Sequence, residues 1–374
     1  MKSRYLVLLS FLLAAAAQAH KPSDSYLALS VDSAKLRGQW DIALRDLEFA
    51  VGLDADGNGE ITWGEVRARH SDIAAYALAR LAVRTDGVEC KLSPTAHLVD
   101  EHSDGAYAVL RFEADCGTRA PAVIELDYGL FFDLDPTHRG LLRFERGGTA
   151  QTGVLSPERP RLAFKAGEIS RLAQFFDYLR EGVWHIWIGF DHILFILSLL
   201  LPSVFVFRNN KWKAAERFRD TFWDVFKVVT SFTIAHSITL SLAALSVISL
   251  PSRVVESTIA LSVMLAALNN LKAVVTERRW AVAFAFGLIH GFGFASVLTD
   301  LGLPQGALLL ALVGFNLGVE VGQLAIVAAF LPLAYGLRGS WFYRRLVFIG
   351  GSAAIALVAT VWLAERALDV KFWP

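Results

Sequence analysis

Long apolar runs in the second half of this chain restrict its fold more than any other feature. In lipid every backbone polar group must find a partner within the protein, and a helix of about 20 apolar residues meets this need while it crosses the hydrocarbon core. Six runs of about that length follow one another, at residues 182–201, 222–248, 254–275, 280–299, 306–333 and 346–364. We therefore expect an all-α polytopic membrane domain of about six helices over residues 182–366, in contact with the lipid bilayer.

The first 19 residues have the pattern of a secretory signal peptide. Lys2 and Arg4 precede a short apolar run, and Ala17-Gln18-Ala19 supplies the small residues of a cleavage site. The alternative is an uncleaved first transmembrane helix, but the apolar run is short and a polar segment follows it. We therefore expect residues 20–165 to be exported, into the periplasm of a bacterial cell.

Loop charges indicate how the chain is oriented. Loops assigned to the outside carry Arg253 as their basic residue, and the formal net charge of zero gives no sign of a nucleic-acid partner. Because cytoplasmic loops are enriched in Lys and Arg, we expect a protein of the bacterial inner membrane. Its N-terminal domain and its C-terminal tail, residues 367–374, would both be periplasmic. The loops assigned to the cytoplasm carry Arg208, Lys211, Lys213, Arg217, Arg219, Lys272, Arg278, Arg279, Arg338, Arg344 and Arg345.

Short alternating runs in residues 20–165 predict a small β-sandwich. The β-rich runs lie at residues 26–31, 36–44, 82–92, 106–114 and 123–132, and Gly, Pro, Asp and Ser separate them. The two cysteines of the chain, Cys90 and Cys116, both fall in this region. An even pair in an exported domain favours a disulfide over two free thiols.

Residues 54–65, DADGNGEITWGE, match the pattern of an EF-hand calcium loop. Gly59 allows the sharp turn, and a short helix at 46–53 and a longer one at 63–81 would flank the loop. We expect Ca²⁺ to bind here as a structural ion, and the alternative is an Asx-rich turn that has lost its ion. The expected ligands are Asp54, Asp56, Asn58, Glu60 (through its backbone carbonyl), Thr62 and Glu65.

The first apolar run, GVWHIWIGFDHILFILSLLL, contains three ionisable residues that are costly to place in lipid. His185 and His192 are seven residues apart, so one stripe of a single helix would carry both. Asp191 lies beside them and would orient an imidazole or bind a cation. The preceding residues 166–181 are expected to form a linker and an interfacial helix with one apolar face. The alternative role for the polar groups is only to hold neighbouring helices together.

Later apolar runs add polar residues that we expect to face the same interior. His236, His290 and Glu320 would complete a cluster of imidazoles and carboxylates, which suits a divalent transition metal. Asn316, Gln323 and Asn269 would support these ligands through hydrogen bonds. The expected metal pathway therefore consists of His185, Asp191, His192, His236, His290 and Glu320.

Two of these patterns resemble a known family. His185, five residues and then Asp191-His192 is similar to the first-helix signature of the HupE/UreJ nickel and cobalt permeases. Their second signature is a repeated His-Gly followed by Glu. Here His290-Gly291 matches its first half, and Gly293-Phe294 stands in place of the second. The stretches GFDHILF, FTIAHSITL, GLIHGFGFA and FNLGVEVGQ, with the signal peptide and exported domain, resemble a longer branch of the family.

The resemblance implies a metal role for His185, Asp191, His192 and His290. His236 and Glu320 are added on their chemistry alone, and the incomplete second signature leaves open whether the metal is nickel.

Three functions are compatible with these patterns. The favoured one is a secondary permease for a divalent transition metal, since the sequence contains no Gly-x4-Gly-Lys-Ser/Thr loop for ATP. The second is a membrane anchor for the calcium-binding domain, acting in envelope assembly or sensing. The third is an intramembrane hydrolase with a metal-activated water. Ser296 near His290 also resembles the intramembrane serine proteases, but the sequence contains no Gly-x-Ser-x-Gly. We do not expect an enzyme, and no protein partner is indicated.

Overall fold

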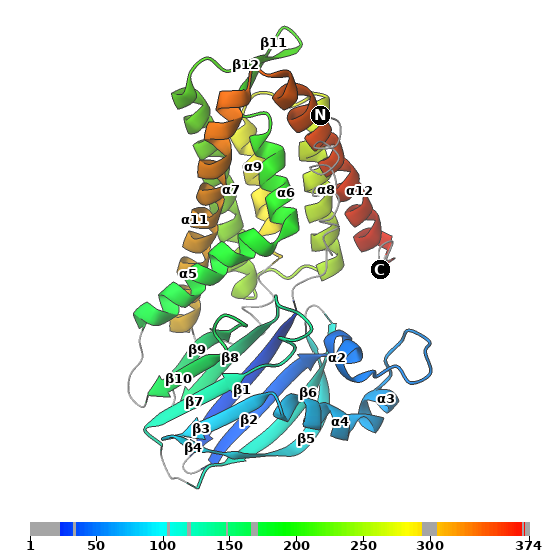
Figure 1. Ribbon diagram of the computed structural model, residues 1–374, viewed down its shortest axis with the longest axis vertical. Coiled ribbons are helices and arrows are strands. Elements are labelled where there is room, and N and C mark those ends of the chain that lie inside the picture. Colours follow the sequence, from blue (N-terminus) through cyan, green and yellow to red (C-terminus); the bar gives the residue numbers. More distant parts are fainter. Residues whose placement is uncertain are drawn as a thin grey trace, which may run out of the picture.

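The computed structural model describes residues 23–32, 35–102, 105–117, 121–146, 149–165, 171–293, 305–368 and 370, and the expected signal peptide lies outside them. A β-rich domain built from residues 23–165 lies at one end, and a bundle of helices begins at residue 171 (Figure 1). The division into a β-rich N-terminal domain and a helical C-terminal half is therefore confirmed.

Two sheets form the β-rich domain. The larger has the strand order β5-β6-β2-β1-β8-β9, and the smaller has the order β10-β7-β3-β4. β1 pairs with β8 in parallel, and the other described pairs within these sheets are antiparallel. The strands are β1 (Asp24–Asp32), β2 (Lys35–Ala43), β3 (Leu81–Thr85), β4 (Val88–Glu89), β5 (Lys91–His102), β6 (Gly105–Asp115), β7 (Val123–Tyr128), β8 (Arg139–Arg146), β9 (Thr149–Leu155) and β10 (Arg161–Lys165).

Alternating apolar residues bring the inner faces of the two sheets together. Trp40 and Ile42 of β2 are buried, and so are Leu126 and Tyr128 of β7 in the other sheet. The rings of Trp40 and Tyr128 lie 5.4 Å apart across the core. At Gly140 a Cβ would lie 2.7 Å from the Tyr128 ring, so this strand needs a glycine where the ring crosses it. Sheet packs on sheet, as in a β-sandwich.

A disulfide joins Cys90 to Cys116. In the β5–β6 pair Lys91 lies opposite Asp115, so the residues just before β5 and just after β6 face each other. The disulfide therefore links the two strands at the end away from their connecting turn.

Three short helices stand between β2 and β3, around the expected calcium loop. They are α2 (Leu44–Val51), α3 (Trp63–Ala68) and α4 (His70–Leu78). The expected helix at 63–81 is therefore two helices with a break at Arg69, whose φ of −92° and ψ of 7° depart from helical values. α3 begins with a capping box, in which Thr62 and Glu65 satisfy each other's backbone N–H groups.

The helical half contains long apolar helices. Among the described residues four are long and apolar enough to cross a membrane, and the bent pair α5 and α6 would make a fifth. α9 has 12 residues, and the rest of the run expected at 280–299 extends beyond the described residues. The elements are α5 (Arg171–Ile188), α6 (Phe190–Leu200), β11 (Phe205–Arg208), β12 (Lys211–Ala214), α7 (Phe218–Ala244), α8 (Ser252–Leu271), α9 (Arg279–His290), α11 (Gln305–Leu337), η1 (Phe342–Gly350) and α12 (Gly351–Leu368).

The prediction of a single helix over residues 182–201 is wrong. The helix α5 starts at residue 171, so it includes most of the expected interfacial helix, and it ends at residue 188, where the chain bends by 72° into α6. The break occurs at Gly189, whose ψ of 96° is extended. A Cβ at Gly189 would lie 2.7 Å from His192 Nδ1 and 2.8 Å from the His185 carbonyl, so only glycine fits this bend.

Glycines also allow two pairs of helices to pack closely. Between α5 and α11, a Cβ at Gly182 would overlap the Phe315 carbonyl, and one at Gly318 would overlap the Leu179 carbonyl. Between α7 and α9, a Cβ at Gly291 would overlap the hydroxyl of Thr239. The glycines therefore let the helices approach as closely as small residues do in membrane bundles.

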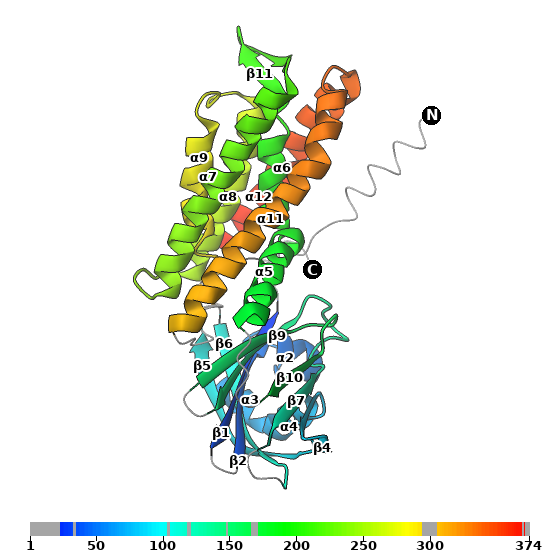
Figure 2. The ribbon, with the colours of Figure 1, turned by 90° about the vertical axis from the view of Figure 1, so that its left-hand side faces the viewer.

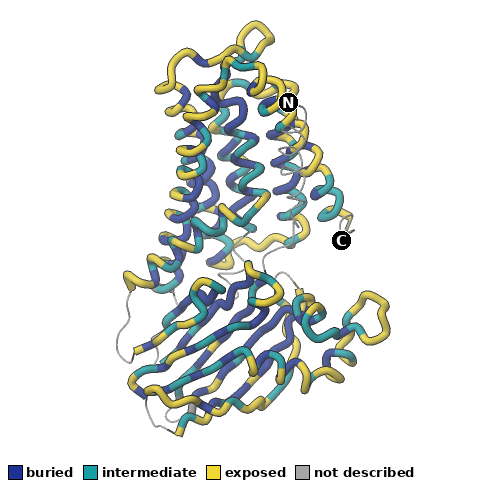
Figure 3. Tube along the Cα trace, in the orientation of Figure 1, coloured by how far each residue is buried: buried dark blue, intermediate teal, exposed yellow. Residues whose placement is uncertain are grey.

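The outer face of the bundle is apolar. Along α11, Leu309, Val313, Leu317 and Val321 recur every four residues and all are exposed. Figure 3 shows buried and exposed residues alternating along the helices of the bundle. The basic hairpin β11–β12 and the turn between α11 and η1 lie at the end away from the β-rich domain, whereas α12 ends near that domain (Figures 1 and 2). Apolar side chains around a bundle with basic loops at one end fit a membrane location.

Candidate metal site

Three histidines meet at the bend between α5 and α6. The rings of His185 and His192 are 4.5 Å apart, and those of His192 and His290 are 5.6 Å apart. His185 belongs to α5, His192 to α6 and His290 to the last turn of α9. The bend therefore brings together His185 and His192, which the sequence predicted on one stripe of a single helix, and His290 joins them from α9.

Asp191 fixes the orientation of the His192 ring. Its Oδ1 accepts hydrogen bonds from the His192 backbone N at 2.8 Å and from His192 Nδ1 at 2.9 Å. Since Nδ1 donates, the neutral ring carries its lone pair on Nε2. This nitrogen is buried and has no hydrogen-bond partner in the structure. A carboxylate that holds the far nitrogen of a ligand histidine is a common arrangement behind metal sites.

Neighbouring residues in the same way fix the rings of His290 and of a fourth histidine, His236 of α7. Ser262 Oγ donates to the Ile259 carbonyl at 2.7 Å, so it accepts from His290 Nε2 at 2.8 Å and leaves the lone pair on His290 Nδ1. Asn316 Oδ1 accepts from His236 Nδ1 at 3.3 Å, which leaves the lone pair on His236 Nε2. Both remaining nitrogens are buried and have no partner in the structure.

Aromatic rings pack around these histidines. Phe232 lies 5.2 Å from the His290 ring and 6.0 Å from the His236 ring, so it connects α7 to the cluster. Phe195 and Phe232 also line a cavity of about 10 Å³, which holds about one water molecule. A larger cavity of about 390 Å³ lies between α6, α8 and α9, and no histidine lines it. Neither of these two cavities is lined by a histidine, and His192, His236 and His290 are buried.

Glu320 and Gln323 lie between α11 and α7, whereas Asn269 lies near the end of α8. Glu320 Oε1 accepts from Thr230 at 2.8 Å and Gln323 Oε1 accepts from Thr233 at 3.0 Å, so both join α11 to α7. Glu320 Oε2 is buried without a partner in the structure. Asn269 was expected to support the ligands, but its amide bonds only to the backbone of residues 274 and 275, where the short turn after α8 places those groups within reach.

Sequence reasoning missed two residues of this site. Ser262 contacts His290, and Arg366 of α12 lies 3.7 Å from Asp191 Oδ2. A serine in an apolar run is too common to stand out, but an arginine near the end of an apolar span was a signal that was not used. Ser296, considered for a hydrolase, lies outside the described residues.

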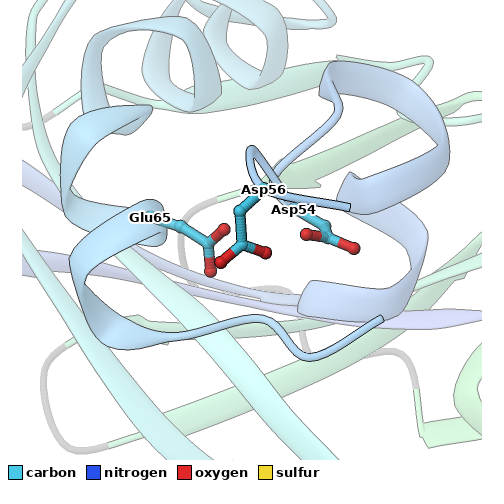
Figure 4. A group of neighbouring side chains, drawn as sticks. All are labelled: Asp54, Asp56 and Glu65. Atoms are coloured by element: carbon cyan, nitrogen blue, oxygen red, sulfur yellow. The ribbon is translucent and has the colours of Figure 1, made fainter. Parts of the chain in front are cut away.

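The loop of residues 54–65 forms a second candidate site. Carboxylate oxygens of Asp54, Asp56 and Glu65 lie within 4.8 Å of one another (Figure 4). In the described part of the chain, no other group of three His, Cys, Asp or Glu residues has ligand atoms this close together. The transmembrane histidines are therefore more widely spaced than these carboxylates. Gly57 and Gly59, with φ of 72° and 85°, allow the loop to turn back on itself.

Backbone N–H groups lower the pKa of two of these carboxylates, Glu65 and Asp54. The Glu65 carboxylate accepts from Thr62 N and Ala55 N, both at 2.8 Å, and from the Thr62 hydroxyl at 2.7 Å. These bonds, those from Thr62 above all, lower the pKa of Glu65 to about 2. The Gly59 N–H is the largest cause that lowers the pKa of Asp54. Asn58 Oδ1 accepts from Glu60 N at 2.7 Å, and the Glu60 side chain is exposed.

Comparisons with known proteins place this site in a family. The family model described as HupE / UreJ protein matches residues 161–366, from β10 to the arginine of α12 that faces Asp191. No curated protein matches the chain. The match covers more than half of the chain and every histidine of the cluster, and the β-rich domain precedes it almost entirely. The chain therefore belongs to the HupE/UreJ protein family, with an additional N-terminal domain.

Proposed function

We propose that this protein is a secondary permease that moves a divalent transition metal, of the nickel and cobalt kind, through the helical bundle. One observation carries the proposal: His192, His236 and His290 each have a buried nitrogen without a partner in the structure, and on each ring the other nitrogen is held by a neighbour. A buried polar atom without a partner costs about 1–3 kcal/mol. The three nitrogen lone pairs lie on adjoining helices, so a cation that passes through the bundle would bind to each of them in turn.

We infer the direction of transport from the loops. The basic hairpin and the turn after α11 lie at the end opposite the β-rich domain, which supports a cytoplasmic location for that end and a periplasmic location for the domain. The metal would enter from the side of the β-rich domain. Because His192, His236 and His290 are buried, we expect transport to require movement of helices, and the bend at Gly189 lies beside His185 and His192. Ligand imidazoles must be neutral, so uptake should weaken as the pH falls.

The test is metal uptake in cells that express the protein at matched membrane levels. Wild type is expected to raise the cell content of nickel, cobalt or zinc, measured by mass spectrometry. His192→Gln and His290→Gln should each reduce this uptake at least about tenfold, since each removes a ligand whose binding is worth more than about 1.4 kcal/mol. His70→Gln, the same change in the β-rich domain, is the matched control and should leave uptake unchanged.

The alternatives predict other outcomes. A membrane anchor would give no uptake of any metal in wild type, and a hydrolase would give product from a lipid or peptide without uptake. Normal uptake by both histidine variants would also rule out the proposed pathway.

We propose separately that residues 54–65 bind Ca²⁺ in the exported domain. The convergence of Asp54, Asp56 and Glu65 supports this site, and hydrogen bonds lower the pKa of both Asp54 and Glu65. Calcium takes oxygen ligands in such loops, and extracellular modules bind it with a dissociation constant of about 10⁻⁴–10⁻³ M. The ion would hold α2 and α3 in place at the edge of the sandwich.

Calorimetry on the full-length protein tests the calcium site. Glu65→Gln should abolish the binding heat, because the ion loses a two-oxygen ligand. Glu60→Gln is the matched control and should bind normally, since only the backbone carbonyl of Glu60 would reach the ion. Equal heats for wild type and Glu65→Gln would contradict the proposal.

A further inference from the structure

Both carboxylate oxygens of Asp191 are engaged, and by groups from different helices. Oδ1 accepts from His192, as described above, and Oδ2 faces Arg366 Nη2 at 3.7 Å. Arg366 is the only lysine or arginine of the described residues within 4.0 Å of this aspartate. The side chains of Asp191 and Arg366 are 20% and 14% exposed, so little water screens their attraction.

Arg366 also has a hydrogen-bond acceptor on α8. Its Nη1 donates to the Glu256 carbonyl of α8 at 3.2 Å, and its guanidinium lies 5.6 Å from the Trp362 ring. The distance to Asp191 is longer than a hydrogen bond. The pair is therefore electrostatic, and the two groups can separate without breaking a directional bond.

We propose that Arg366 is a built-in counter-ion that shares Asp191 with the transported metal. It neutralises the carboxylate while no metal is bound, and it withdraws toward Glu256 when a metal takes Oδ2. A divalent cation at Asp191 Oδ2 is close to the guanidinium, and like charges repel strongly in a region of low dielectric. Arg366 therefore keeps the affinity for metal low enough for release. This inference rests on the proposed permease function and names what regulates its site.

The test measures Ni²⁺ binding to the purified full-length protein by competition with a chelating dye. Arg366→Gln should bind Ni²⁺ about tenfold more tightly than wild type, because the repulsion is removed. Arg366→Lys should bind about threefold more tightly, since a compact, strongly hydrated ammonium is drawn toward water and away from the site. Arg253→Gln is the matched control: Arg253 joins α8 to the same end of α12 through the Ala367 carbonyl, and it should not change the affinity.

Tighter binding is a result that a purely structural role would not give, because lost packing weakens a site. A folded glutamine or lysine variant that binds Ni²⁺ no more tightly than wild type overturns the inference, and the lysine variant carries the test if the glutamine variant does not fold. If wild type binds and transports metal while the variants do not differ from it, Arg366 has no such role and the permease proposal stands. If wild type neither binds nor takes up any transition metal, the permease proposal fails and this inference fails with it.

Discussion

Tyr128 lies at the centre of a hydrogen-bond chain that crosses the core of the β-rich domain. The Trp40 N–H can only donate and the Asp46 carboxylate can only accept, so every bond in the chain points the same way. His138 must then donate from Nδ1 and accept at Nε2, and burial keeps it neutral by lowering its pKa to about 3. The chain runs from Trp40 to Ser25 (3.2 Å), Tyr128 (2.7 Å), His138 (2.6 Å), Ser23 (2.5 Å) and Asp46 (2.7 Å).

Tyr128→Phe interrupts this chain and should destabilise the β-rich domain. The Ser25 hydroxyl would keep its bond from Trp40 but lose the acceptor of its own proton, and His138 Nε2 would remain buried without a partner, at about 1–3 kcal/mol for such a group. Thermal unfolding of the full-length protein should show a lower midpoint for the β-rich domain. Tyr76→Phe is the control, because the Tyr76 hydroxyl has no hydrogen bond in the structure. Equal midpoints for the two variants would show that the chain contributes nothing.

At the scale of elements, the bend between α5 and α6 decides where the histidines lie. A straight helix would carry His185 and His192 about two turns, or about 10 Å, apart along its axis, whereas the bend brings their rings to 4.5 Å. The bend depends on Gly189, since any Cβ there meets the His192 ring and the His185 carbonyl.

Gly189→Ala should therefore reduce metal uptake strongly, at least about tenfold, because a displacement of about 1 Å at a site can cost about a hundredfold in activity. Gly336→Ala is the matched control: Gly336 lies in α11, a methyl group added there would meet nothing within 4 Å, and alanine should stabilise the helix slightly. Uptake of metal by both variants, at equal membrane levels, distinguishes the two results. Wild-type uptake by Gly189→Ala would mean that the bend is not needed.

The sequence predicts elements better than it predicts how they meet. Residues 26–31 and 36–44 alternate clearly enough to identify β1 and β2, but β9 contains Gly153 and polar residues and was not expected. Glycine is common in membrane helices, so Gly189 did not reveal a break. The pairing of Arg366 with Asp191 depends on α12 returning to the start of α6, which no local pattern contains.

At the scale of the whole molecule, the β-rich domain contacts α5, the helix that carries His185. Tyr178 of α5 donates to Thr152 Oγ1 of β9 at 3.1 Å, and Asp177 pairs with Arg159. One turn further along α5, Glu181 lies 3.7 Å from Arg139 of β8. These contacts connect the domain to the bundle through α5, and α11 also lies against β9.

The return of α12 to the end of the bundle near the β-rich domain predicts that the C-terminus and this domain share one side of the membrane. An alkaline phosphatase fused after residue 374 should be active, and a cytoplasmic reporter at the same place should not. Fusions after Asn209, in the turn of the basic hairpin, should give the opposite pattern. An inactive phosphatase at the C-terminus would contradict this topology.

Because Tyr178 joins α5 to the β-rich domain, a rotation of the domain about this contact would be transmitted along α5. His185 follows Tyr178 by seven residues, which is about 10 Å along a helix. A tilt of the β-rich domain by about 10° around that point would swing His185 by about 2 Å, far more than the roughly 0.2 Å within which metal–ligand distances are held. Under the proposed permease function, a partner that tilts the β-rich domain would therefore displace a ligand of the metal.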